Sequence, residues 1–380
     1  MRSLAFFLAL LAVSASGSVL RVPSLGSSFP RGGAISSPSQ APVTVSTLLG
    51  SDSNVVQVSI PEEKYFPASP GSPHKVVFPL TLSPTEGKVK KNLEGWVYYH
   101  RAAIDKLLPI HGAILFRGFD LPSATHFSSL VQSGFSYEEQ PYIGGNAVRT
   151  IVAPRVFTTN ESPPSQKIPF HHEMAQVPRF PTKVFFYCLT PSAVGGETPI
   201  VLSSMVSDAI EREFPSLFRR FKDEGVKYIR TMPTEDDATS ALGRGWCSTY
   251  QTRVKEVAEA EMLKDGVEWE WLPNGDLKTV SKRLEAVRLY DGKNVFFNQV
   301  VAAYSGWNDK RNISKNAIVF GVSGEKLPEK EMDRIIELMD ELAVAYKWQQ
   351  GDVILIDNRL TMHSRKTFEK PRVVLASLCR

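Results

Sequence analysis

Three residues of this chain could together form the ligand set of a metal site. His171 and Glu173 are separated by one residue, and His363 lies far downstream, after the apolar run 353–356 and the turn-like segment 357–359. Two imidazoles and one carboxylate bind Fe(II) on one face and leave three positions of an octahedral ion open. The pattern therefore predicts a ferrous centre at which small molecules and oxygen could meet.

The adjacent His172 is predicted to take no part in this centre. Side chains alternate between the two faces of a strand, so His171 and Glu173 would point one way and His172 the other. We expect His172 to be a hydrogen-bonded structural residue. A His-x-acid pair is a weak signal alone, because 7 histidines and 40 acidic residues in 380 positions would give one roughly 0.7 times by chance. Other residues must therefore support the assignment of a metal site.

Arg372 is the second residue type of interest, because it opens the apolar run 373–378 after a short polar loop, 364–371. A guanidinium at the head of an apolar strand needs an anionic partner, and a carboxylate matches its geometry best. The loop length predicts that the strands of His363 and Arg372 pair as a hairpin, which would put Arg372 within side-chain reach of His363. An arginine at the rim of the protein is the alternative interpretation.

The elements that must position these residues are short strands with helices between them. Strand-like runs cover 112–119, 183–189, 294–300, 353–356 and 373–378, and helical spacing covers 92–108, 126–134, 205–221 (despite Pro215), 253–263 and 329–346. The polar, proline-bearing stretch 154–169 is predicted to be loop. Because β and α segments do not alternate regularly, this order favours a mainly β fold with inserted helices, an antiparallel jelly-roll sandwich.

Composition narrows the range of partners. The formal charge of +4 results from 44 basic and 40 acidic residues, a near balance that implies no nucleic acid or other polyanion. The cysteines, Cys188, Cys247 and Cys379, are too few and too scattered for a disulfide framework or a zinc site, so we expect them to be buried apolar residues.

The first fifty residues have the composition of a targeting leader. Arg2 precedes an apolar run, 4–13, that ends in small residues and is too short to span a bilayer. The following stretch is rich in Ser, Pro and Gly and has no acidic residue before Asp52. Two interpretations stay open, a secretory signal with a disordered spacer or a bipartite leader for a complex plastid. Either way we expect 1–50 to carry no fold, 51–380 to form one domain with helical insertions at about 205–290, and the mature chain to have no membrane segment.

From about Gly112 to Leu378 the chain resembles the taurine dioxygenase superfamily of Fe(II)/2-oxoglutarate oxygenases, most closely its clavaminate-synthase-like branch. The segment 168–175, with sequence Ile-Pro-Phe-His-His-Glu-Met-Ala, resembles the iron-binding segment of that branch. Gly195-Gly196-Glu197-Thr198 is similar to its glycine turn, 357–359 with His363 to its distal-ligand segment, and Arg372 falls where the family has its 2-oxoglutarate arginine. The blocks occur in the family's order.

The resemblance implies a fold, a cofactor set and roles for individual residues. The fold would be a double-stranded β-helix, with Fe(II) held by His171, Glu173 and His363, and with 2-oxoglutarate, whose far carboxylate Thr198 and Arg372 hold, and O2 as co-substrates. A small-molecule substrate would then be oxidised with release of succinate and CO2. The intact Glu173 favours hydroxylation or a related oxidation over halogenation.

The resemblance leaves the substrate open. Taurine-type enzymes carry a second arginine four residues after the first, and Ala376 stands there, which argues against a sulfonate substrate. Arg365 is interpreted as solvent-facing, and Asn298 either lines the substrate cavity or packs in the core. A protein-modifying oxygenase and a non-catalytic metal-binding jelly-roll protein are the competing functions. The anion clamp of Thr198 and Arg372 argues against the second, because a structural metal site does not need one.

Overall fold

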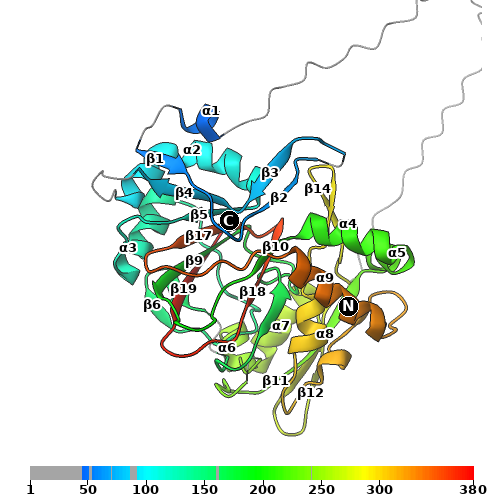
Figure 1. Cartoon of the computed structure of the whole chain (residues 1–380). Helices are drawn as coiled ribbons and strands as arrows, with labels where there is room; N and C mark the ends of the chain where they lie inside the picture. The colour runs from blue at the N-terminus through cyan, green and yellow to red at the C-terminus, as the bar shows by residue number, and fades with distance from the viewer. Residues whose placement is uncertain (1–44, 51–53, 70, 86–91, 160–161, 241) are drawn as a thin grey trace, which may run out of the picture. The chain divides into compact units, whose positions relative to one another are not determined.

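The computed structural model describes residues 45–380 except 51–53, 70, 86–91, 160–161 and 241 (Figure 1). Most of the predicted leader lies outside the described residues, and its targeting role stays a prediction. The expectation that 1–50 carries no fold is wrong for its last residues, because Val45–Leu49 forms helix α1 and Leu49 is buried in the core. The chain from Val43 to Arg380 forms one compact unit.

The largest sheet has eight strands, and apolar runs form it because both of its faces are covered. Ile114 and Phe116 belong to the core on one face, and Ala113 and Leu115 belong to the core on the other. This is the alternation expected of a strand between two apolar layers. In spatial order the strands are β1 (Val55–Gln57), β4 (Leu80–Pro84), β5 (Ala113–Phe116), β17 (Val353–Asp357), β9 (Lys183–Thr190), β19 (Val373–Cys379), β7 (Val156–Thr158) and β6 (Ile151–Ala153) (Figure 1).

A three-stranded antiparallel sheet faces this large sheet and carries the metal-ligand candidates. Its order is β10 (Ile200–Leu202), β18 (Thr361–Arg365) and β8 (Ile168–His171). Ile200 of β10 shares a core cluster with Phe186 of β9 and Ile354 of β17, so apolar side chains fill the space between the two sheets. The candidate site lies within this space.

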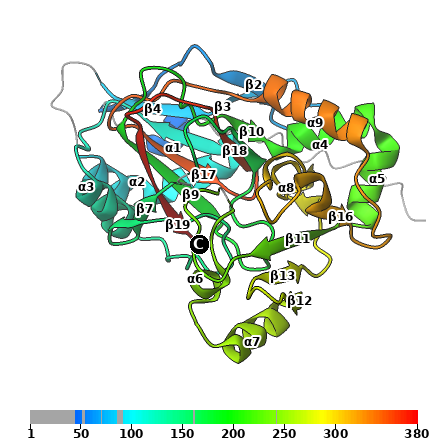
Figure 2. The same ribbon diagram turned by 90° about the horizontal axis from the view of Figure 1, so that it is seen from below.

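Helices cover the outer faces of both sheets (Figure 2). Helix α2 (Leu93–His111), helix α3 (Ala124–Ser129) and the π-helical turn η1 (Leu130–Phe135) pack on the large sheet. Helices α4 (Ser203–Glu213), α5 (Pro215–Asp223), α8 (Val300–Gly306) and α9 (Glu329–Leu342) share a core with residues of the small sheet. Helix α2 begins where the sequence predicts. The side chain of Asn92 accepts hydrogen bonds from the amides of Glu94 and Gly95, which have no acceptor within the helix.

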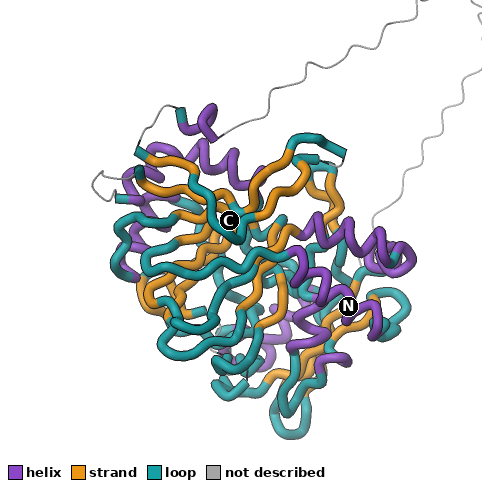
Figure 3. Tube along the Cα trace, in the orientation of Figure 1, coloured by secondary structure: helices purple, strands orange, loops and turns teal. Residues whose placement is uncertain are grey.

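A further sheet with helices α6 (Trp246–Tyr250) and α7 (Lys255–Asp265) extends from this body. Its strands are β12 (Glu268–Trp271), β13 (Leu277–Val280), β11 (Val226–Met232) and β16 (Ile318–Phe320), in that order. The remaining elements are the hairpins β2 (Lys64–Pro67) with β3 (Lys75–Phe78) and β14 (Arg288–Tyr290) with β15 (Lys293–Val295), and the 3-10 turn η2 (Ser314–Asn316). Strands lie mainly inside and helices outside (Figure 3). Within the described part of the chain, no helix has the length and apolarity needed to cross a bilayer.

The mainly β architecture with inserted helices is confirmed, and the detailed winding of a jelly roll stays a prediction. Three local predictions need correction. The helix predicted at 205–221 is two helices, because Pro215 cannot continue α4 and instead occupies the first turn of α5. The inserted region about 205–290 contains strands β11 to β14 besides its helices. The strand predicted at 294–300 ends at Val295, and helix α8 begins at Val300.

Long-range pairing explains the other differences. The predicted loop 154–169 contains β7 and the start of β8, since the neighbouring strands β19 and β18 supply hydrogen-bond partners for its backbone. The predicted helix 329–346 ends at Leu342, and Val344 instead forms a bridge with Ile200. The hairpin predicted between the strands of His363 and Arg372 is wrong: β18 belongs to the small sheet and β19 to the large one, so the loop between them crosses from sheet to sheet.

Candidate active site

His171, Glu173 and His363 converge in space. His171 is the last residue of β8 and is paired directly with His363 of β18. Glu173 follows in a turn in which Met174 adopts a left-handed conformation (φ 58°). One ligand atom from each of the three residues lies within 4.8 Å of the others. Strand pairing and this turn therefore bring the predicted ligands together from distant parts of the chain.

The histidines are held in a state that suits a metal. The Nδ1 atom of His171 lies 2.9 Å from the Pro169 carbonyl oxygen and donates to it, which leaves the Nε2 lone pair for a ligand bond. Burial lowers the pKa of His171 to about 4, so its imidazole is neutral at pH 7. The ring of His363 lies between His171 and Phe186, with centroid distances of 4.3 and 4.9 Å. Packing thus fixes both rings.

Glu173 is fixed through both its backbone and its side chain. The side chain of Asn358 accepts a hydrogen bond of 2.8 Å from the Glu173 amide and donates one of 3.0 Å to its carbonyl. The Nη2 atom of Arg149 lies 2.9 and 3.0 Å from the two carboxylate oxygens. Burial would raise the pKa of Glu173, but the Arg149 charge and the nearby imidazoles of His171 and His363 hold that pKa well below its ordinary value. The carboxylate is therefore ionised.

His172 points away from the site, and its predicted structural role is supported. Its Nδ1 contacts the Asn358 carbonyl oxygen, and its Nε2 lies 2.7 Å from the Ser203 hydroxyl oxygen. Asn298 is also structural: its Nδ2 donates to the Ala286 carbonyl and its side-chain oxygen accepts from the Val300 amide. Of the two alternatives for Asn298, core packing is the one that the contacts favour.

Arg372 and Thr198 line a small cavity that His171, Glu173 and His363 also line. The Nε atom of Arg372 donates to the Gly196 carbonyl at 2.7 Å, and its Nη2 lies 3.3 Å from the Thr198 hydroxyl oxygen. Trp348 donates from its indole nitrogen to the same hydroxyl at 3.1 Å. Arg372 and His363 line the same small cavity, although the two strands do not pair. A molecule with a metal-binding end and a carboxylate end fits this arrangement.

Arg365 is buried, so its solvent-facing interpretation is wrong. Its guanidinium donates to the carbonyl oxygens of Ser162, Pro163 and Gln166 at 2.7–3.0 Å. These bonds tie β18 to the loop that precedes β8. Arg365 therefore supports the wall of the site, because the backbone carbonyls of this loop supply acceptors for its buried guanidinium.

A larger cavity, of about 230 Å³, is also lined by His171 and Glu173. Its wall is rich in carboxamides and also contains the cations Arg149 and Lys167. Leu242, Trp307 and Asn308 form another part of the wall. The carboxamides of this wall include the side chains of Asn146, Gln166, Gln176 and Gln299. Because a carboxamide can both donate and accept hydrogen bonds, such a wall could bind an amide or a carboxylate.

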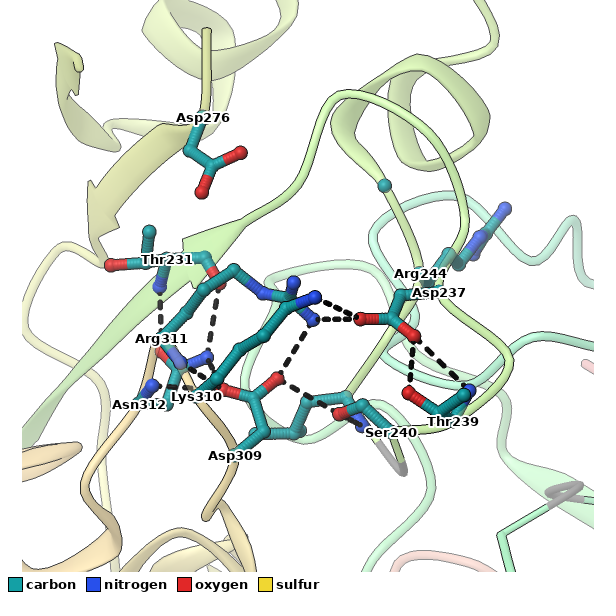
Figure 4. A network of polar contacts seen from close by, with 12 residues as sticks. Thr231, Asp237, Thr239, Ser240, Arg244, Asp276, Asp309, Lys310, Arg311 and Asn312 are labelled. Atoms are coloured by element: carbon teal, nitrogen blue, oxygen red, sulfur yellow. Dashed lines mark hydrogen bonds and ion pairs between the residues drawn. The ribbon is translucent and has the colours of Figure 1, made fainter. Parts of the chain in front are cut away.

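Two loops of this wall are joined by a polar network (Figure 4). Arg311 donates from Nη2 to Asp237 at 2.9 Å and to Asp309 at 3.0 Å, and Ser240 donates to Asp309 at 2.8 Å. We call Asp237, Asp309 and Arg311 the loop latch. It connects the loop that carries Leu242 to the segment that carries Asn308.

The residues present fit a ferrous ion. Two imidazoles and one carboxylate are the expected ligand types, and they leave one side of the ion open. His363 also has a buried Nδ1 atom without a hydrogen-bond partner among the described residues. The site therefore combines a neutral His171, an ionised Glu173 and a second imidazole around a common point.

Arg149 and Trp348 are the site residues that the sequence did not reveal. Arg149 lies in a polar segment before β6, and Trp348 lies in a loop before β17, with no motif around either. A basic or aromatic residue at such a place has no local signal. Only the folded chain brings them beside Glu173 and Thr198.

Comparisons with known proteins agree with this site. The family model "Taurine catabolism dioxygenase TauD, TfdA family" matches residues 77–378. A clavaminate synthase-like protein of Arabidopsis thaliana is 42% identical over 338 residues, which cover 86% of this chain and 98% of that protein. The dapdiamide synthesis protein DdaC of Enterobacter agglomerans is 30% identical over 329 residues, which cover 82% and 93% of the two chains.

Among solved structures, PvcB from Pseudomonas aeruginosa aligns with a TM-score of 0.45 and 13% identity over 85% of this chain and 92% of that one. A likeness of this size supports no conclusion by itself, and the assignment rests on the family model and the two relatives. This chain belongs to the TauD/TfdA family of dioxygenases.

Proposed function

We propose that this chain oxidises a small molecule held in the larger cavity, with 2-oxoglutarate in the smaller one, and releases succinate and CO2. One observation carries the proposal: His171 and Glu173 line both cavities, whereas Thr198 and Arg372 line only the smaller. Two molecules can therefore approach the same metal ligands through two different cavities. We assign His171, Glu173 and His363 as ligands of Fe(II).

The smaller cavity suits 2-oxoglutarate because its two ends differ. The far carboxylate would accept hydrogen bonds from Arg372 and Thr198, and Trp348 holds the Thr198 oxygen in place. Burial lowers the pKa of Arg372 to about 10, still well above neutral pH, so the guanidinium stays charged. A charged, partly buried arginine whose hydrogen-bond acceptors among the described residues are neutral oxygens favours an anion beside it.

The protein residues mainly position the reactants and exclude water. The ring of Phe186 covers His363, and Ile168 lines both cavities beside His171. When bound, Fe(II) with 2-oxoglutarate and O2 supplies the oxidising power for attack on a C–H bond. The carboxamide wall of the larger cavity would decide which bond of the substrate lies near the metal.

The proposal is tested with purified chain, Fe(II) and 2-oxoglutarate in an oxygen electrode, with succinate measured at the end. We expect slow O2 uptake that requires both components, faster uptake with some members of a metabolite library, and none in the His363→Ala variant. Tight Fe(II) binding without any 2-oxoglutarate-dependent O2 uptake would instead support a non-catalytic metal-binding protein.

A further inference from the structure

Arg149 lies where the two cavities meet, next to the carboxylate of the metal-ligand set. It lines both cavities together with His171 and Glu173. Its side chain is 9% exposed and that of Glu173 is 6% exposed. The ion pair between them is therefore almost entirely shielded from water, and its geometry affects any metal that Glu173 binds.

The position of Arg149 is fixed by its surroundings. The next residue, Thr150, donates from its amide to the Thr158 hydroxyl at 2.9 Å and accepts from the Thr158 amide at the same distance, which attaches the segment to β7. The guanidinium carbon lies 4.2 Å from the ring centroid of Tyr142 and 4.8 Å from that of Phe157. The cation has little freedom to follow a carboxylate that moves.

The contact itself is asymmetric. A single nitrogen, Nη2, contacts both oxygens of Glu173. The buried Nε and Nη1 atoms of Arg149 have no hydrogen-bond partner among the described residues. Paired arginines in proteins more often present two nitrogens to two oxygens. Here one carboxylate oxygen can leave the contact while the other keeps it.

The buried pair of Arg117 and Asp352 shows the difference. Arg117 presents Nε and Nη2 to the Asp352 carboxylate at 2.6–3.3 Å, and Nη2 also donates to the Lys347 carbonyl. In that pair both nitrogens that face the carboxylate, Nε and Nη2, have hydrogen-bond acceptors, as expected of a contact with a purely structural role. The pair at Glu173 leaves donors unmatched, which is costly for a purely structural contact in a buried place.

A carboxylate can give a metal one oxygen or two. With two imidazoles in place, one carboxylate oxygen leaves three positions of an octahedral ion, enough for the two chelating atoms of 2-oxoglutarate and for O2. Two carboxylate oxygens would leave only two positions. The reaction therefore depends on the number of oxygens that Glu173 offers.

We propose that Arg149 is a positioning residue that retains one oxygen of Glu173 and so limits this carboxylate to a single bond with the metal. The inference rests on the proposed function, because it assigns Glu173 to Fe(II). It also predicts an unusual result: removal of Arg149 removes a positive charge close to the metal, so metal affinity is kept or increased while the third open position is lost.

The experiment compares wild type with Arg149→Met, Arg149→Gln and Arg149→Lys. Co(II) binding, followed by calorimetry and by its visible spectrum, reports metal affinity and coordination number without turnover. Nitric oxide binding to the Fe(II) and 2-oxoglutarate-loaded protein, followed by electron paramagnetic resonance, reports the position that O2 needs. We expect Arg149→Met to bind Co(II) at least as tightly as wild type, with an altered spectrum, and to bind nitric oxide at least 10-fold more weakly.

Rescue distinguishes positioning from general damage. We expect Arg149→Lys, which can still donate to one oxygen, to recover most of the nitric oxide binding, and Arg149→Gln to recover part of it. Arg117→Met is the matched control: it removes a largely buried arginine from a carboxylate that is not a metal-ligand candidate, and it should lower thermal stability without changing the Co(II) spectrum of the folded protein.

Two results would overturn the inference. One is nitric oxide binding and a Co(II) spectrum unchanged in all three Arg149 variants; the other is loss of Co(II) binding in all three while Arg117→Met retains it. Failure of the proposed function looks different, because the wild-type protein itself would then bind no 2-oxoglutarate at its metal. Arg149→Gln and Arg149→Lys keep a polar side chain of similar length, so they remain informative if Arg149→Met does not fold.

Discussion

His171 and His363 are directly opposite each other on the antiparallel strands β8 and β18, with ring centroids 4.3 Å apart. The backbone hydrogen bonds of the sheet hold residues paired in this way, so these residues move less than residues in a loop. The register shifts just after His363, an irregularity of the kind that re-aims a side chain near an active site. The two histidines are therefore positioned before any metal arrives.

Replacement of Arg372 by Ala should weaken 2-oxoglutarate binding and leave the metal in place. A charge-assisted hydrogen bond contributes about 1.5–3 kcal/mol, which corresponds to a rise of about 10- to 100-fold in the KM for 2-oxoglutarate. Calorimetry with Co(II) and steady-state succinate formation measure the two effects separately. Equal loss of metal would contradict the role assigned to Arg372.

Replacement of Gly196 by Ala should disturb Arg372 through contact alone. Gly196 has φ +79°, and a Cβ atom there would lie 2.8 Å from the Arg372 Cδ atom. We expect the KM for 2-oxoglutarate to rise about 10-fold, as a rough guide from the loss of one hydrogen bond, with metal affinity unchanged. Gly292→Ala is the control, since Gly292 has φ +73° but no atom within 4 Å of its added Cβ. A KM in Gly196→Ala no higher than in the control would exclude a contact effect.

Replacement of His172 by Ala should cost stability and not metal affinity. The buried imidazole contacts Ser203 and the Asn358 carbonyl, so its loss leaves two polar groups unmatched in the core. We expect the free energy of unfolding to fall by about 2–4 kcal/mol in urea denaturation. His74→Ala is the exposed control and should change it by no more than about 0.5 kcal/mol. A large loss of Co(II) affinity in folded His172→Ala would count against a structural role.

Weakening of the loop latch should loosen one wall of the larger cavity. Asp309→Asn removes the charge that Arg311 and Ser240 contact, so we expect faster hydrogen exchange of the backbone amides at 237–240 and 242–243, by about 10-fold for the loss of roughly 1.4 kcal/mol. Glu235→Gln, in an exposed pair with Arg253, should have little effect. Unchanged exchange in Asp309→Asn would show that other contacts hold the loop.

The loop latch should also respond to acid in a defined direction. Hydrogen bonds from Thr239 and then Arg311 lower the pKa of Asp237 below its ordinary value. A lowered carboxyl pKa contributes stability above the ordinary value, about 3.9, and this contribution disappears as the pH falls through the folded-state pKa. Exchange of the loop, corrected for the intrinsic rate, should therefore be constant near neutral pH and accelerate only below about pH 4.

Much of the site followed from the sequence because its signals are local. The ligand types at 171, 173 and 363 follow from chemistry. His172 does lie apart from them as predicted, although a turn after the end of β8, and not strand alternation, places Glu173. Buried strands such as β9 and β17 and the helices α2 and α7 were recognisable from short-range periodicity. Local patterns are sufficient for such elements, since neighbouring residues largely decide them.

Tertiary structure decided the rest, because burial and strand pairing depend on residues far apart in the chain. Nothing in the sequence around Arg365 indicated that carbonyl oxygens of the loop 162–166 would accept hydrogen bonds from it. The sequence of 364–371 was equally compatible with a hairpin and with the crossing between two sheets that the structure shows. Arg149 acquires its role only when β6 and β8 bring it beside Glu173. The sequence alone indicated which side chains could bind a metal, and only the tertiary structure showed which residues contact and position those side chains.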